Sequence, residues 1–549
     1  MRIDWFWLED YKNLKDLLID FDEDHWITVL IGWNGTGKSN VIEALTTVFR
    51  DLVMGENVEG AKNRPGFCYK IRYSCRGNWV HIDADPKRRN AYEIRVIPIA
   101  KTQGEDEATS PVTDLDKVQG ESITISKLIA SDSQLLPEYV FGYYSGGSDR
   151  LENIFKKYLF RYDKDLRAGI DPGLKRLFYA MPVHSNFVLL SFIINNTELT
   201  NTFLRDHLGL EDGGIDSVLF VLHQPPWKSK EGDPRFWNAK GIVRDFLAKI
   251  YDISLAPLRI SRRVDVSLWN KKNVEFLYLY VKDLESLREL AGGKSPRDFF
   301  QNLESTYVSE LMEEVRIRIK LRKNDGSVTF RELSEGEQQL LTVLGLLRFT
   351  SEEESLFLLD EPDTHLNPQW SVDYLKHLED FLSDEDGEQD SSHVILSTHN
   401  PLAVAELKKE QVQILKRDKD DLSITSHEPY DHPRGMGYAG VITSEMFGLD
   451  AALDSHTKKL LEEKRQLAAK DDPLTDEEKT QLGELNERLE KLGFRYEVRD
   501  PVYTEYLKAR YLTEKEDIKP SGKILSPSEK HEKAKKLVDR ALTAIESQK

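Results

Sequence analysis

An eight-residue glycine loop constrains this chain more than any other feature of its sequence. The loop is Gly32-Trp33-Asn34-Gly35-Thr36-Gly37-Lys38-Ser39. It follows an apolar, β-rich run at 26–31 and precedes a segment, 41–49, whose apolar residues recur at helical spacing. In such a strand–loop–helix unit, backbone N–H groups converge on phosphate oxygens, and the helix N-terminus adds to the attraction. The sequence therefore predicts a phosphate-binding loop whose contacts come from Asn34, Gly35, Thr36, Gly37, Lys38, Ser39 and Asn40.

A second part of the same site is predicted at an acidic strand end. Lys38 is expected to reach the β and γ phosphates, and the Ser39 hydroxyl is expected to ligate Mg²⁺. The apolar run 356–359 ends in Asp360-Glu361-Pro362. A carboxylate at the carboxyl tip of a strand can hold the ligand shell of Mg²⁺, which is the role we expect of Asp360. Glu361 is then placed to act as general base on an attacking water.

Two other segments carry candidate phosphate contacts. Ser334, Gly336 and Glu337 lie in Leu333-Ser334-Glu335-Gly336-Glu337-Gln338-Gln339, directly before an apolar helix. A hydroxyl and free N–H groups at a helix N-terminus form a second anion site, although nothing local identifies the phosphate. His399 follows a strand that ends at Ser397 and is a candidate γ-phosphate contact. The alternative for His399 is an ordinary capped loop histidine.

Composition limits the class of protein. The 549 residues carry a formal net charge of -19, which argues against a chain that coats nucleic acid everywhere, although a local basic face can still bind it. No run of about 18 apolar residues occurs, and the first residues lack the apolar stretch of a secretory signal. Cys68 and Cys75 are too few for a disulfide framework and lack the spacing of a zinc site. We expect reduced thiols in a cytoplasmic protein.

The motifs suggest four segments. We expect an N-terminal lobe at 1–100 with the glycine loop, and an insert of helical and loop segments at 101–310. A C-terminal lobe at 311–430 would contain Ser334, Asp360, Glu361 and His399. A helical appendage would occupy 431–549, with the lysine-rich stretch from Lys519 as the least ordered part.

Two basic clusters and one helix pair stand out in these segments. Apolar and basic residues alternate over 315–322, which predicts a strand with one basic face. A second cluster contains Arg259, Arg262, Arg263, Lys271 and Lys272. Either cluster could contact a phosphate backbone, and the alternative is a solvated face balanced by acidic neighbours. The spacing of leucines after a possible capping box predicts a helical hairpin at 455–493.

Taken together and in this order, the motifs resemble the head of the ABC-type ATPases, in the branch that includes the SMC, Rad50, RecF and OLD-like proteins. The Walker A motif of that family matches 32–39, its signature 333–339, its Walker B motif 356–361 and its switch histidine His399. Residues 363–368 resemble the OLD-like form of the D-loop and differ from that of transporters. The resemblance implies an α/β head, a mixed sheet with a P-loop core, that carries a mid-chain insert and a helical C-terminal appendage.

The resemblance also implies a mechanism. In this family two heads sandwich two ATP molecules with Mg²⁺, so Ser334 would act in trans on the γ-phosphate, and water on Glu361 would hydrolyse ATP. Lys38 and His399 would complete the catalytic set. Gln103 and Gln134 are candidates for the Q-loop, which cannot be placed from the sequence. The Lys12-Asn13 pair resembles an N-terminal segment that often lies near the nucleotide in such heads.

Within this branch the chain most resembles the PtuA family of Septu-type and retron-linked anti-phage ATPases. That resemblance implies a homodimer or higher oligomer, a separate HNH nuclease partner of the PtuB kind, and an association with a reverse transcriptase or nucleic acid. The hairpin at 455–493 would then be a docking site for partner chains. Asp418 and Asp420 form an Asp-x-Asp, but no acidic strand end precedes them as a Toprim nuclease requires, so we expect no nuclease in this chain.

Three other functions remain open. One is a RecF-like or OLD-like repair ATPase that binds DNA directly. Another is the nucleotide-binding subunit of a transporter, which the long insert disfavours. The last is a scaffold that holds ATP without turnover, against which the intact Glu361 argues. The absence of a long heptad pattern argues against a long-armed chromosome-organising machine.

Overall fold

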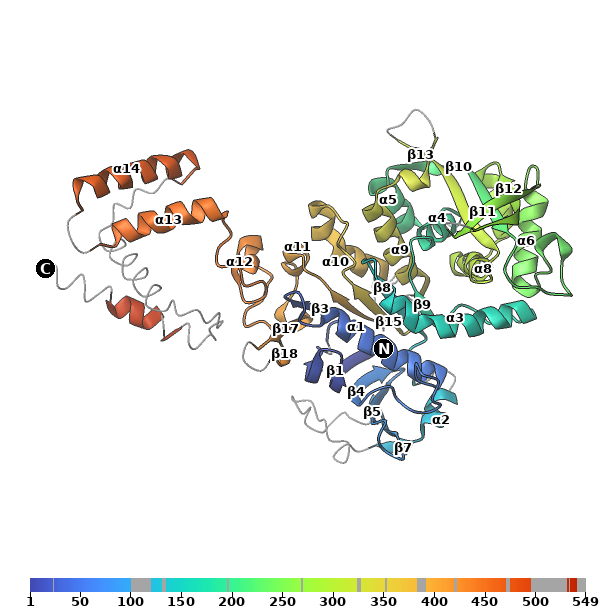
Figure 1. Cartoon of the computed structure of the whole chain (residues 1–549), viewed down its shortest axis with the longest axis horizontal. Coiled ribbons are helices and arrows are strands. Elements are labelled where there is room, and N and C mark those ends of the chain that lie inside the picture. Colours follow the sequence, from blue (N-terminus) through green and yellow to red (C-terminus); the bar gives the residue numbers. More distant parts are fainter. Residues whose placement is uncertain are drawn as a thin grey trace. The chain divides into compact units, whose positions relative to one another are not determined.

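The computed structural model describes most of the chain. The described residues are 1–22, 24–99, 120–130, 135–194, 197–267, 270–322, 327–350, 353–382, 392–418, 422–470, 474–494, 531–532 and 534–540. They form two compact units, Met1–Glu428 and Pro429–Lys549 (Figure 1). No described helix is long and apolar enough to cross a membrane. Gln103, Gln134, Asp420 and most of the stretch from Lys519 lie outside the described residues.

A seven-stranded sheet forms the centre of the first unit. Its strand order is β18-β17-β3-β16-β15-β8-β9, and every neighbouring pair is parallel except β17 with β18. The central strands are buried along nearly their whole length, as expected for apolar runs covered on both faces. The strands are β3 (Ile27–Gly32), β8 (Tyr139–Tyr144), β9 (Leu177–Tyr179), β15 (Ser355–Asp360), β16 (His393–Ser397), β17 (Val412–Arg417) and β18 (Ile424–His427). Because these strands except β18 are parallel, their carboxyl ends lie at the same edge of the sheet. The last residues of β3, β8, β15 and β16 are Gly32, Tyr144, Asp360 and Ser397.

Helix α1 (Lys38–Met54) joins this sheet to a second one. The second sheet has six antiparallel strands in the order β2-β1-β4-β5-β6-β7. One core contains apolar residues of α1 and of both sheets, among them Val41, Phe49, Phe6 and Leu358. The strands are β1 (Arg2–Tyr11), β2 (Leu14–Asp20), β4 (Tyr69–Cys75), β5 (Asn78–Ala84), β6 (Tyr92–Pro98) and β7 (Glu121–Ile123), followed by helix α2 (Ile125–Ala130).

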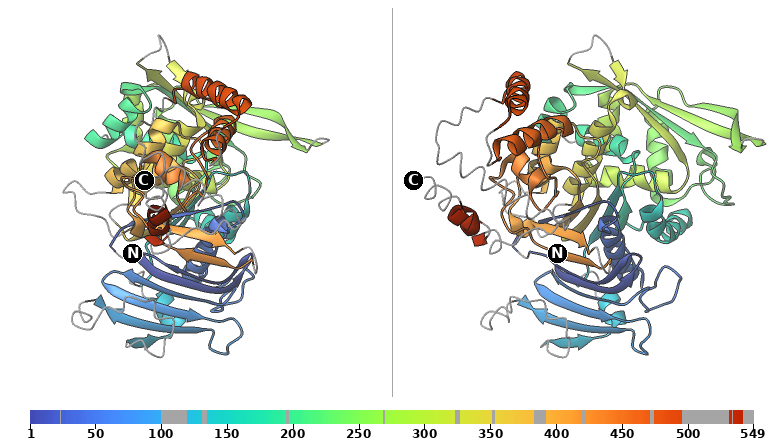
Figure 2. Two further views of the ribbon diagram at one scale, coloured as in Figure 1. Left: turned by 90° about the vertical axis from the view of Figure 1, so that its left-hand side faces the viewer. Right: turned by 60° about the vertical axis from the view of Figure 1, so that its left-hand side comes forward.

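The insert contains a third sheet, which the expected helix and loop segments did not include. Its five antiparallel strands have the order β11-β12-β10-β13-β14, and Figure 2 shows β11 and β12 extending from it as a long ribbon. The strands are β10 (Leu210–His223), β11 (Leu258–Ser267), β12 (Asn270–Val281), β13 (Met312–Leu321) and β14 (Ser327–Thr329). The basic strand expected over 315–322 is β13, whose buried apolar residues alternate with exposed Arg316, Arg318 and Lys320.

Helices surround these sheets and connect them. Those of the insert are α3 (Arg150–Ala168), α4 (His184–Ile194), α5 (Glu198–Asp206), η3 (Pro234–Phe236), α6 (Gly241–Ile253), α7 (Leu284–Ala291) and α8 (Pro296–Val308). Those of the C-terminal half are η4 (Phe330–Glu332), α9 (Glu335–Thr350), α10 (Pro368–Leu382), α11 (Pro401–Val404) and η5 (Lys409–Gln411). Helix α3 packs against α1 on one side and against α6 and α8 on the other, so it links the sheet core to the insert.

The second unit contains a helical hairpin. Helix α12 (Gly437–Thr443) precedes the hairpin, which consists of α13 (Ser455–Ala468) and α14 (Asp476–Lys491). Leu460 and Leu467 of α13 pack against Leu485 and Leu489 of α14. At the start of α14, the Thr475 hydroxyl accepts the backbone N–H of Glu478, while the Glu478 carboxylate accepts the N–H of Thr475. The predicted capping box is therefore present.

Candidate functional site

The glycine loop adopts a conformation that its glycines make possible. Gly32, Gly35 and Gly37 have φ values of 150°, 83° and 91°, a region that side chains disfavour. A Cβ on Gly37 would also lie 2.4 Å from Cδ2 of Leu14. The ammonium of Lys38 donates to the carbonyl of Gly32 at 2.8 Å, and it is nearly buried. Burial lowers the pKa of Lys38 to about 8, although Glu361 and Asp360 act in the opposite direction.

Asparagines hold this loop against the first strands. The Asn13 amide donates to the carbonyl of Gly35 at 3.0 Å, and the Asn40 amide donates to Oδ1 of Asn13 at 2.5 Å. Lys12 instead forms an ion pair with Glu43 of α1, at 2.5 Å. The sequence predicted that both Lys12 and Asn13 lie near the nucleotide. Asn13 contacts the glycine loop directly, whereas Lys12 contacts α1, the helix that follows the loop.

Asp360 faces the loop from the neighbouring strand end. Its Oδ1 accepts hydrogen bonds from the hydroxyls of Ser39, at 3.1 Å, and of Ser397, at 2.5 Å. Burial raises the pKa of Asp360 above its ordinary value, and these hydroxyls and Arg150 partly offset that effect. The hydroxyl of Ser39 and the carboxylate of Asp360 are oxygen donors of the type that Mg²⁺ prefers. Among the described residues, no group of three or more His, Cys, Asp or Glu side chains is placed to hold a metal ion.

Glu361 and His399 meet at the same edge. Nε2 of His399 lies 3.2 Å from Oε1 of Glu361. The hydrogen bond from His399 lowers the pKa of Glu361, with further help from Lys38 and Arg150, so the carboxylate stays ionised. Glu361 has a φ of 54°, and its backbone N–H donates to the carbonyl of Ser397 at 3.1 Å. A non-glycine residue in this region stores local strain, which is frequent at functional sites.

Arg150 also belongs to this site, and our sequence reasoning missed it. It is the first residue of α3, and its guanidinium lies 3.4 Å from Oδ2 of Asp360 and 3.5 Å from Oδ1 of Asn40. Residues 143–147 are the end of β8 and the loop that leads to Arg150. The only sequence signal was a loop rich in glycine and serine between a strand and a helix.

The signature segment caps helix α9. Ser334 is exposed, and its hydroxyl donates to the Glu337 carboxylate at 2.7 Å. Within the described residues, the side chain of Ser334 hydrogen-bonds with Glu337 alone and makes no hydrogen bond to the glycine loop of its own chain. Gly336 is buried, and a Cβ there would lie 2.5 Å from the carbonyl oxygen of His365. The signature segment therefore packs directly on the D-loop.

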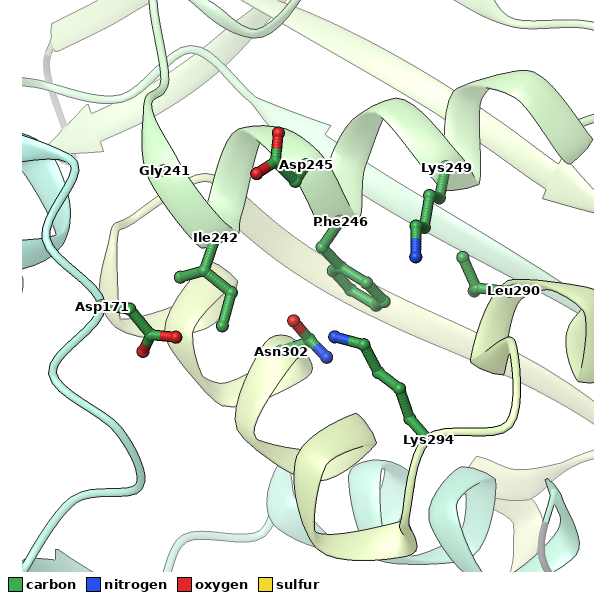
Figure 3. A pocket seen from close by; sticks show the side chains of 9 residues that line it. All are labelled: Asp171, Gly241, Ile242, Asp245, Phe246, Lys249, Leu290, Lys294 and Asn302. Atoms are coloured by element: carbon green, nitrogen blue, oxygen red, sulfur yellow. The ribbon is translucent and has the colours of Figure 1, made fainter.

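The remaining sequence candidates lie elsewhere. Asp418 follows β17, and its N–H donates to the carbonyl of Ser423. Cys75 is buried in the core, and Cys68 is partly buried. A cavity of about 310 Å³ lies in the insert between α6, α7 and α8, where Lys249, Lys294 and Asn302 face it (Figure 3). We call the residues that meet at the edge of the central sheet, Lys38, Ser39, Arg150, Asp360, Glu361 and His399, the strand-edge site. None of them lines this cavity.

Two family models match separate parts of the chain. A family model described as an AAA ATPase domain matches 1–105, which contains Lys38 and Ser39. A second model, described as an AAA domain of the AbiEii toxin type (Type IV TA system), matches 227–405, which contains Ser334, Asp360 and His399.

Several curated proteins are similar to the chain. The Septu protein PtuA of Bacillus mycoides (strain KBAB4) is 30% identical over 97 residues, which span 18% of this chain and only 12% of PtuA. The protein named "Retron Vc95 probable ATPase", from Vibrio cholerae serotype O1 biovar El Tor, is 27% identical over 74% of this chain and 72% of its own length. The corresponding Retron Ec83 protein of Escherichia coli is 20% identical over 76% of this chain and 72% of its own. A solved Smc head bound to the C-winged helix domain of ScpA covers 78% of this chain and 98% of its own, with 14% identity and a TM-score of 0.32.

The strand-edge site and the two family matches indicate an ATPase of the AAA type. Within that class, the chain is related to PtuA and to the retron ATPases.

Proposed function

We propose that the chain binds Mg²⁺–ATP at this strand edge and hydrolyses it to ADP and phosphate. The observation that carries the proposal is the convergence of Lys38, Ser39, Asp360, Glu361 and His399 from three separate segments. The loop amides and Lys38 bind the triphosphate, and Ser39 and Asp360 would hold the metal. Mg²⁺, when bound, neutralises charge on the phosphate oxygens. Glu361, kept ionised by His399, takes a proton from the attacking water.

We further propose that two copies close head to head around ATP. Ser334 is exposed at the tip of α9 and, among the described residues, makes no hydrogen bond to the glycine loop of its own chain, which supports a role on the nucleotide of a second copy. The Ser334–Glu337 bond would open so that the hydroxyl can donate to a phosphate. Hydrolysis then removes the γ-phosphate that joins the two copies, so the dimer separates.

In this proposal the dimer regulates a separate HNH nuclease, of the kind that PtuB provides, in anti-phage defence. The relation to PtuA and the retron ATPases supports that role. The hairpin of α13 and α14 is the proposed docking site for a partner chain. Its helices share a leucine core, and their outer faces are charged and exposed.

A direct contact with nucleic acid, as in a repair ATPase of the RecF or OLD-like kind, is the second candidate. The strand registers put Arg262, Lys272, Arg316, Arg318 and Lys320 on one face of the insert sheet, although they come from two separate sequence clusters. Directly opposed residues in antiparallel strands share a face. Tyr278 lies on the same face and accepts a hydrogen bond from Arg262 at 2.7 Å. Basic and aromatic side chains together suit phosphates and bases.

That face also contains acidic residues, and they reduce its net charge. Glu314 pairs with Arg316 at 2.9 Å, and Asp216 lies 3.9 Å from Arg318. Arg259, from the second sequence cluster, lies on the opposite face and pairs with Glu275. The basic face is therefore narrower than the two sequence clusters suggested, which is why ATP-dependent dimerisation is the leading proposal.

The test uses Glu361→Gln, which keeps the shape of the side chain but removes its ability to take a proton. With Mg²⁺–ATP the variant should accumulate as a dimer, seen as an earlier peak in sizing chromatography, whereas with ADP it should stay a monomer. The double variant Lys38→Ala, Glu361→Gln is the matched control and should not shift with either nucleotide. An elution volume of Glu361→Gln that ATP leaves unchanged would contradict the head-to-head dimer.

A further inference from the structure

The loop after β8 leads to Arg150, a second cation beside the proposed phosphate site. Strand β8 pairs in parallel with β15, and Tyr144 lies opposite Asp360 in that pairing. The N–H of Ser145 donates to the carbonyl of Asp360 at 3.3 Å, so the loop starts beside the acidic strand end. Helix α3 begins five residues later at Arg150. A Cβ on Gly146 would lie 2.3 Å from the Tyr144 ring, so glycine allows that ring to lie under the loop.

The position of Arg150 suits a side chain that binds an anion. Its guanidinium lies 5.2 Å from the centre of the Tyr144 ring and touches Asp360 and Asn40 only at 3.4 and 3.5 Å. A guanidinium has five N–H donors, and these two long contacts use two of them. The side chain is one-third exposed, at 33%, so the remaining donors are open to a ligand.

The charge of Arg150 acts at the end of the site where hydrolysis is proposed. It lowers the pKa of Glu361, after the larger effects of His399 and Lys38. Lys38 belongs to the loop after β3, which lies two strands from β15 on one side, whereas Arg150 follows β8, the neighbour of β15 on the other side. A terminal phosphate next to Glu361 would therefore lie between two cations that belong to different elements.

We propose that Arg150 is a nucleotide-contacting residue that distinguishes ATP from ADP by donating to the terminal phosphate. The inference rests on the proposed ATP site and adds to it a contact that none of its motifs includes. Arg150 is the first residue of α3, and α3 packs on α6 and α8 of the insert. A bound terminal phosphate would thus contact the first residue of the helix that joins the sheet core to the insert.

The test compares the affinities of ATP and ADP in Mg²⁺-containing buffer by calorimetry. A charge-assisted hydrogen bond to phosphate predicts that Arg150→Ala weakens ATP binding by about 10- to 100-fold, while ADP binding changes by less than about 3-fold. Arg150→Lys should recover part of the loss, because a point charge remains without the fork. Lys156→Ala, which removes an exposed cation of the same helix, is the matched control and should leave both affinities unchanged.

Two further measurements separate this inference from the proposed site itself. Lys38→Ala should abolish binding of both nucleotides; if it does so while Arg150→Ala binds ATP like the wild type, the site stands and the inference is wrong. An equal loss of ATP and ADP affinity in Arg150→Ala would also overturn it. Thermal melting of Arg150→Ala without nucleotide should match that of the Lys156→Ala control, which shows that any loss of affinity is not a loss of folding.

Discussion

A buried charged triad in the insert allows a sharp prediction about stability. The Glu304 carboxylate of α8 contacts the ammonium of Lys175 and, at 2.8 Å, Nε2 of His184. All three side chains are at most 1% exposed. Nδ1 of His184 accepts the N–H of Met181 at 2.8 Å, so Nε2 carries the proton that is donated to Glu304. The single carboxylate therefore satisfies two groups that have no access to water.

Replacing Glu304 with Ala should lower the free energy of unfolding by about 3–5 kcal/mol, because it leaves a lysine charge buried without a partner. The pKa of Glu304 leads to a similar figure. Burial pushes that pKa up, but Lys175 and His184 outweigh the effect and bring it down to about 2 from an ordinary 4.5. A shift of that size corresponds to roughly 3 kcal/mol.

Urea unfolding followed by tryptophan fluorescence measures the difference. The matched control is Glu93→Ala, which removes an exposed carboxylate that pairs with Arg88 at 3.0 Å and should cost less than about 1 kcal/mol. If Glu304→Ala unfolds within about 1 kcal/mol of the wild type, the argument that this triad is a desolvated, mutually dependent unit is wrong.

The depressed pKa of Glu304 also predicts that the free energy of unfolding depends on pH. Because the folded pKa of Glu304 is depressed, its contribution is fully present above about pH 4.5 and is lost as the pH falls toward about 2. The stability advantage of the wild type over Glu304→Gln, which cannot titrate, should therefore shrink over that window. An advantage that stays constant from pH 5 to pH 3 would contradict the assigned shift.

Other variants test the nucleotide site, the signature segment and the basic face. Lys38→Ala should abolish ATP binding measured by calorimetry, and unchanged affinity would remove the phosphate-loop assignment. Gly336→Ala should push the α9 tip away from His365 and so prevent the ATP-dependent dimer in sizing chromatography, while ATP affinity stays within about 2-fold of the wild type; a normal dimer would show that the close packing is dispensable. Changing Arg318 and Lys320 to Glu should weaken DNA or RNA binding in a filter assay and flatten its salt dependence, whereas equal affinity in both proteins would mean that β13 is only a solvated face.

Local sequence predicted the parts of the site that lie next to their own strands. The glycine loop after β3 and the carboxylates after β15 each follow a buried apolar run, so their positions at a strand end needed no knowledge of the rest of the chain. The alternation over 315–322 predicted the faces of β13 for the same reason. Each of these features depends on a short segment and on one periodicity.

Features that depend on pairing between distant segments could not be predicted in this way. Arg150 reaches Asp360 only because β8 lies beside β15, and 210 residues separate the two side chains. The insert sheet was missed although residues of β11 and β12, such as Ile260 and Val274, alternate with polar residues at period two. A close count of that period would have found the strands, but their order in the sheet comes only from three-dimensional packing.

The order of the central sheet has a consequence for the making of this protein. Strand β3 lies between β16 and β17, and the hydroxyl of Ser39 meets a carboxylate 321 residues further along the chain. At roughly 5–20 residues per second, a ribosome needs on the order of 15 seconds to a minute to synthesise that intervening stretch. A growing or prematurely ended polypeptide therefore has its phosphate loop long before it has Asp360 and Glu361, which the proposed hydrolysis needs. Translation itself would thus delay the proposed hydrolysis until the residues up to about 417 have emerged.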